Sequence, residues 1–97
     1  MRSLVPSEHE ACTALQFAAI SGSMSVVTLL IQKGANVKAP AIGVHGRTAL
    51  EGAAEHGRLD IVQLLLKLGV EAAGSRAIQF AREKGHDGVV DLLEEIS

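Results

Sequence analysis

The sequence predicts an all-α solenoid built from three stacked helical hairpins, because the chain repeats itself. A ten-residue pattern at residues 13–22, Thr-Ala-Leu-Gln-Phe-Ala-Ala-Ile-Ser-Gly, returns at residues 48–57 and, with more changes, at residues 76–85. The glycines that end the three copies are 35 and then 28 residues apart. Periods of this length are typical of supersecondary units that bury their apolar faces against one another.

A second matching stretch follows each copy and completes the repeating unit. It reads Val-Val-Thr-Leu-Leu-Ile at residues 26–31 and has counterparts at residues 61–66 and 89–94. We therefore expect each unit to contain two short helices and a connector. Small side chains in the first helices would let neighbours approach closely, while leucines fill the layers between them. These residues are Ala18, Ala19, Ala53 and Ala54, with Leu15, Leu29 and Leu30.

Three features of the unit are similar to those of ankyrin repeats. They are the Thr-x-Leu helix start, the Gly in the middle of the unit, and Gly-Ala-Asn-Val at residues 34–37, which resembles the family's Gly-Ala-Asp-Val. The resemblance covers about residues 11–97 and implies an ankyrin-repeat solenoid with one long β-hairpin-like connector. It divides a single domain, residues 1–97, into repeats at about 11–43 and 44–73 and a truncated C-terminal cap at 74–97.

The starts of the first two units carry their own capping residues. Thr13 and Thr48 stand where an N-cap hydroxyl is needed, and Gln16 and Glu51 follow three residues later, as in a capping box. The ankyrin family usually has His at the position of Gln16 and Glu51. Because that His supplies hydrogen bonds between repeats in the family, we expect lower stability here than in a consensus array.

The third unit has the composition of a C-terminal cap. It places Arg82, Asp87 and Glu94 where the first two units have apolar residues that stack, among them Ala19 and Ala54. A polar outer face is what the terminal repeat of a stack requires. The connector at residues 70–75 is also shorter than the preceding one, and Ser75 is expected to cap the following helix in place of a Thr.

The N-terminal end has no matching charged surface. Between positions 11 and 46 the formal charges are Lys33 and Lys38, whereas residues 76–97 contain eight. The first unit therefore resembles an internal repeat. We expect either that this chain is the C-terminal piece of a longer array, which we favour, or that residues 1–10 or a second copy cover the open face. If a second copy does so, a charge at Met24 should disrupt the dimer.

Composition excludes several other classes of protein. A formal net charge of -2 provides no basic field for nucleic acid, and no apolar run approaches the roughly 20 residues that span a bilayer. The chain has one cysteine, Cys12, which is typical of a reducing compartment. We therefore expect a cytoplasmic or nuclear protein without nucleic-acid or membrane partners.

Catalytic and metal-binding patterns are scarce. Glu8, His9 and Glu10 with Cys12 could hold a divalent ion, but their spacing matches no defined site. Residues 43–46, Gly-Val-His-Gly, lack the Lys-Ser/Thr of a phosphate loop. We expect no cofactor, no metal and no enzymatic activity, and a small metal-dependent enzyme remains an outside alternative.

A protein-binding surface is the function that remains. In ankyrin proteins, partners usually meet the connector tips and the exposed side of the first helices. Ile42 and Val44 would be unusually apolar at such a tip, unless they pack against the neighbouring repeat. The resemblance implies an adaptor or scaffold that binds a helix or an extended peptide, with a self-associating element as the alternative. The predicted contact residues are Ile20, Ser21, Ile42, Val44, His45, Arg47, Glu55, His56, Arg76, Glu83 and Lys84.

Overall fold

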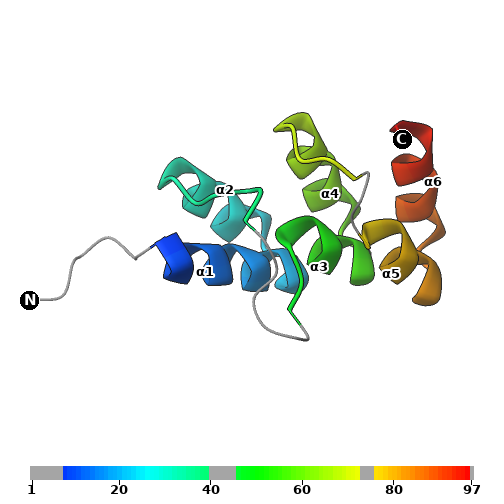
Figure 1. The fold of residues 1–97 in the computed structure, drawn as a ribbon, viewed down its shortest axis with the longest axis horizontal. Helices are drawn as coiled ribbons and strands as arrows, with labels where there is room; N and C mark the ends of the chain where they lie inside the picture. The colour runs from blue at the N-terminus through cyan, green and yellow to red at the C-terminus, as the bar shows by residue number, and fades with distance from the viewer. Residues whose placement is uncertain (1–7, 40–45, 73–75, 97) are drawn as a thin grey trace, which may run out of the picture.

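Six helices pack as three hairpins in the computed structural model, which describes residues 8–39, 46–72 and 76–96, and the side chains of 14–39, 46–72 and 76–95. Figure 1 shows α1, α3 and α5 side by side in one row, with α2, α4 and α6 in a second row. The all-α solenoid is thus confirmed. No strand occurs in the described residues, so the β-hairpin-like form of the connector is not supported. The helices are α1 (Glu8–Ser21), α2 (Met24–Gln32), α3 (Ala49–Glu55), α4 (Leu59–Lys67), α5 (Ala77–Glu83) and α6 (Asp87–Ile96).

The core is aliphatic and runs through all three hairpins. Ala19, Ala54 and Ala81 are fully buried, and their small side chains allow α1, α3 and α5 to stack closely. The layers between are filled by leucine and valine side chains, as predicted for Leu15. Leu29 is an exception. It was predicted to fill a layer between helices, but its side chain is half exposed.

The two predicted capping boxes have different outcomes. At Thr48 the box is present: the Glu51 backbone N–H donates to the Thr48 hydroxyl, and the Thr48 N–H donates to Glu51 Oε1, both over 3.1 Å. The prediction for Thr13 is wrong, because α1 begins at Glu8 and Thr13 lies inside it. Residues 8–12 contain neither Gly nor Pro and include two glutamates, which are favourable near a helix N-terminus.

The turns inside the first two hairpins each contact the hairpin that follows. Gly57 has φ +70°, and a Cβ there would lie 2.6 Å from His86 Nδ1 in the third hairpin. Gly22, with φ +79°, is covered in the same way by Arg58, whose Nε–H donates to the Ile20 carbonyl oxygen over 3.1 Å. Only glycine combines this left-handed backbone with such a close approach. The turns therefore fix how neighbouring hairpins stack.

The C-terminal end is charged, as predicted. Arg82, Asp87 and Glu94 are all exposed, and Arg82 Nη2 donates to Glu94 Oε1 over 2.8 Å. The expected cap at Ser75 lies outside the described residues, and Arg76 occupies the N-cap position of α5.

Candidate binding surface

Eight of the eleven predicted contact residues lie in the described part of the chain. Ile42, Val44 and His45 lie outside it, so their place at an apolar connector tip stays a prediction. The remaining residues come from α1, α3 and α5 and from the segments that lead into α3 and α5. They divide into an exposed group and a group that is occupied by contacts within the protein.

The exposed group forms a row along the ends of the first helices of the hairpins. Ser21, His56 and Lys84 occupy the same position in the three sequence copies, at the C-terminal ends of α1, α3 and α5, and all are exposed. Glu83 beside Lys84 is exposed as well, and it accepts a hydrogen bond from Gln79 Nε2 over 3.2 Å. Because the three helices lie side by side (Figure 1), this row follows the long direction of the stack.

Ile20 belongs to the contact between the first two hairpins. It is only partly exposed, and its Cγ1 would lie 2.7 Å from a Cβ placed at Gly52. Position 52 corresponds to Phe17 and Phe80 in the other copies, so glycine at this position makes room for Ile20. A partner can therefore reach only part of this side chain.

Arg47 and Glu55 are paired with each other. Arg47 Nε lies 3.3 Å from Glu55 Oε1, and the two side chains are 23% and 15% exposed. The Arg47 guanidinium also lies over the Phe80 ring, 4.1 Å from its centroid. A cation over an aromatic face contributes about 0.5–1 kcal/mol at such partly exposed sites. The contact with Phe80 joins the second hairpin to the third, and Glu55 pairs with the same guanidinium within the second hairpin, so both residues have a structural role at this surface.

Arg76 and Glu51 form the second link between these hairpins. The Arg76 backbone N–H donates to Glu51 Oε2 over 2.9 Å, and its Nη2 donates to Glu51 Oε1 over 3.3 Å. Glu51 is 5% exposed. Sequence reasoning missed this link, because it treated the absence of His at position 51 as a loss of hydrogen bonds between repeats. Glu51 instead supplies such bonds.

The environment of Glu51 favours its charged form. Burial alone raises the pKa of its carboxyl group. Hydrogen bonds from the Arg76 and Thr48 backbones and from the Arg76 guanidinium, with the charge of that group, outweigh burial and hold the pKa below its ordinary value of 4.5. Glu51 is therefore a structural anion that is not available for proton transfer.

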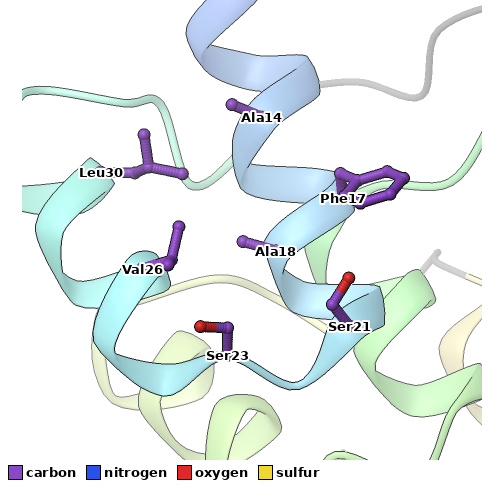
Figure 2. A pocket seen from close by; sticks show the side chains of 7 residues that line it. All are labelled: Ala14, Phe17, Ala18, Ser21, Ser23, Val26 and Leu30. Carbon is purple, nitrogen blue, oxygen red and sulfur yellow. The ribbon is translucent and has the colours of Figure 1, made fainter.

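An apolar hollow opens on the outward side of the first hairpin, and its shape is the other feature that sequence reasoning missed. It has a volume of about 610 Å³ and lies between α1 and α2. Figure 2 shows Ala14 and Ala18 of α1 facing Val26 and Leu30 of α2, with Phe17 at the far edge of α1. Phe17 is 72% exposed. The sequence aligns Phe17 with Phe80 of the third copy, but only the structure shows that Phe80 is buried while Phe17 is not.

The sequence of the chain can be compared with known protein families. A family model described as ankyrin repeats (3 copies) matches residues 1–74, which is most of the chain. The chain belongs to the ankyrin-repeat family. The matched residues end before α5 and α6, which continue the same stacking of ankyrin hairpins.

The curated relatives of the chain are longer than the chain itself. The chain is 42% identical over 82 residues to the probable E3 ubiquitin-protein ligase XBOS33 of Oryza sativa subsp. japonica, an alignment that covers 78% of the chain and 15% of that protein. It is 38% identical over 72 residues to ankyrin repeat domain-containing protein 63 of Homo sapiens, which covers 69% of the chain and 18% of the relative. The chain thus spans less than a fifth of the length of these relatives.

Ankyrin repeats, the family to which this chain belongs, are in general protein–protein interaction modules. In the part of the chain that the structure describes, no three His, Cys, Asp or Glu residues come together in a way that could hold a metal ion. Within the same residues, no helix is both long enough and apolar enough to cross a membrane.

Proposed function

We propose that this chain is a non-catalytic adaptor or scaffold module that binds a helix or an extended peptide of another protein along the ends of α1, α3 and α5. The exposed row of Ser21, His56 and Lys84, with Glu83 beside it, carries this proposal. These residues recur at the repeat period, so a linear partner that lies along the stack meets one of them at each hairpin.

The links beneath this row support a binding role. The Arg47–Phe80 contact and the Arg76–Glu51 pair join the second hairpin to the third, and Glu55 pairs with Arg47 within the second hairpin. A surface whose backbone is already ordered loses less conformational entropy on binding than a flexible one does. The residues of the row differ from one hairpin to the next, and a partner is selected by the polarity at each position. Ile42, Val44 and His45 of the connector lie outside the described residues and stay predicted contact residues for the same partner.

A charge exchange at the end of the row tests the proposal. The double variant Glu83→Lys, Lys84→Glu reverses two exposed charges and leaves the net charge of the chain unchanged. The matched control is Lys67→Glu, Asp91→Lys, which exchanges exposed charges on α4 and α6, away from the row. Circular dichroism checks that both variants keep the helicity of the parent.

The measurement has two steps. The immobilised parent first captures proteins from the source cells, and each captured protein is then purified and titrated against the three forms by calorimetry. We expect the row variant to bind about tenfold more weakly or worse, which corresponds to roughly 1.4 kcal/mol, and the control to bind like the parent. Equal binding by the parent and the row variant would place the partner elsewhere on the molecule.

A further inference from the structure

The outward surface of the first hairpin leaves several apolar side chains of the described residues exposed. We call it the N-terminal face, and it consists of the hollow between α1 and α2 together with Phe17 at its edge. The lining residues whose side chains the structure describes are apolar apart from two serines, and none of them is charged. Exposed apolar surface of this kind commonly marks an interaction site.

The other two hairpins bury the equivalent surface. Phe17 is 72% exposed, whereas Phe80 at the same repeat position is 8% exposed beneath Arg47 of the preceding hairpin. Ala14 is exposed, but Ala49 is 2% and Ala77 is 0% exposed. The contrast follows the repeat register, so it reflects a missing neighbour on the first hairpin.

Two positions on the second helices show the same contrast. Val26 is 43% exposed, while Ile61 and Val89 in the other hairpins are 0% and 2% exposed. Leu30 is partly exposed, whereas its counterparts Leu65 and Leu93 are fully buried. The N-terminal face therefore has the composition of a buried stacking surface over both of its helices.

Among its described residues, the first hairpin lacks the contacts by which a hairpin in this stack holds the one before it. Arg58 and His86, at one repeat position, each lie against the turn glycine of the hairpin before them, but the first hairpin has the small Ser23 there. A non-helical segment leads into α3, whereas residues 8–12 extend α1 as helix. Both differences favour an occupant that belongs to a second molecule.

The charges at the two ends of the stack indicate which surface of the second molecule can pair with the N-terminal face. The opposite end of the stack carries the exposed Arg82–Glu94 pair. Stacking it on the N-terminal face would remove these charges from water without new partners, which is costly. Two N-terminal faces bring no charges together among the lining residues whose side chains are described, so the face suits a copy of itself better than it suits the other end.

The shape of the face also suits a twofold pair. In an isologous contact, each copy must present both a projection and a recess that receives it. Phe17 provides the projection, and the recess lies beside it, where the small Ala14 and Ala18 face Val26 and Leu30 (Figure 2). We propose that two copies of this chain pair through their N-terminal faces about a twofold axis, with Phe17 of each entering the hollow of the other. Ser21 of the row lines the hollow and would be covered in this dimer, whereas His56, Glu83 and Lys84 would stay accessible in both copies.

Sedimentation velocity over a concentration series tests this proposal. One hairpin face offers a small interface, so we expect a reversible monomer–dimer equilibrium in the micromolar range. Phe17→Glu should remove the dimer at every concentration. Leu68→Glu, a matched change at a leucine 43% exposed at the end of α4, should leave it intact. Since Phe17 is largely exposed, circular dichroism should show both variants folded.

A second variant gives an independent readout. The chain contains no Trp, so Phe17→Trp introduces a single indole at the proposed contact. Its emission should shift to the red on dilution, as the dimer dissociates and the indole becomes hydrated. A parent that stays monomeric at all concentrations, a dimer that survives Phe17→Glu, or open-ended growth typical of head-to-tail stacking would each overturn the proposal.

Discussion

Glu51 acts at two places with one side chain. One carboxylate oxygen accepts from the Thr48 N–H that starts α3, and both oxygens accept from Arg76 at the start of α5. A neutral side chain of the same shape cannot satisfy all of these donors. The residue thus connects the start of one helix to the start of the next repeat.

Replacing Glu51 with Gln should therefore destabilise the whole stack. The variant keeps the volume but turns one acceptor into a donor that faces the Arg76 N–H. We expect the free energy of unfolding to fall by about 1–3 kcal/mol, the usual cost of leaving a buried hydrogen-bonding group unpaired. Urea unfolding followed by circular dichroism measures this. Glu83→Gln, at an exposed position, serves as the control and should change stability by no more than about 0.5 kcal/mol.

The same residue predicts a pH dependence. Because the folded protein lowers the pKa of Glu51, the unfolded chain binds the proton more readily. The contribution of Glu51 to stability is therefore fully present above its ordinary pKa of 4.5 and is lost as the pH falls through the lower folded value. Urea midpoints measured from neutral to acid pH should converge for the parent and Glu51→Gln. A constant difference across that range would contradict this account.

At the level of the elements, the turns determine how hairpins meet. Gly57 and Gly85 share the left-handed backbone, with φ of +70° and +74°, but a Cβ at Gly57 meets His86 and one at Gly85 meets nothing within 4 Å. Substitutions at the two positions therefore distinguish the energetic cost of backbone strain from the cost of disturbing the contact between hairpins.

Gly85→Ala should cost about 1–2 kcal/mol, because a non-glycine residue is forced into the left-handed region. Gly57→Ala should cost more, since the added methyl group must also displace the His86 ring from its place over the turn. The difference in unfolding free energy between the two variants isolates the contact. Equal losses would mean that His86 moves aside without cost.

At the level of the whole molecule, stability should vary along the stack. The middle hairpin has a neighbour on both sides, and Ile61, Val62 and Leu65 of α4 are fully buried. The first hairpin has its N-terminal face uncovered. Repeat proteins open from their ends, since each unit is stabilised mainly by its neighbours.

Hydrogen exchange should show this gradient. In dilute solution, where the chain is monomeric, we expect the amides of α4 to exchange most slowly and those of α1 and α2 to exchange faster. Mass spectrometry of labelled peptides resolves the three hairpins. Uniform protection along the chain would indicate that it unfolds only as a single unit.

The sequence predicted what depends on local pattern. The repeated pattern predicted the hairpins and their order. The capping box at Thr48 was predicted from two residues three positions apart, and the charged C-terminal end of the stack from Arg82 and Glu94. The bond from Glu51 to Arg76 joins residues 25 positions apart, which local pattern does not encode. The exposure of Phe17 also depends on an absent neighbour, and the connector residues of the predicted surface remain untested.

Arg58 and His86 occupy the same position in successive repeats, and the residue at this position affects how the array can gain further repeats. Each side chain covers a glycine turn of the same form in the preceding hairpin. The second hairpin takes part in this contact twice. Its Arg58 covers Gly22 of the first hairpin, and its Gly57 is covered by His86 of the third. A gene duplication that copied this hairpin would therefore produce a junction that already fits, whereas a copy of the first hairpin would bring Ser23 to the new turn. The middle of the array is the natural place for it to lengthen.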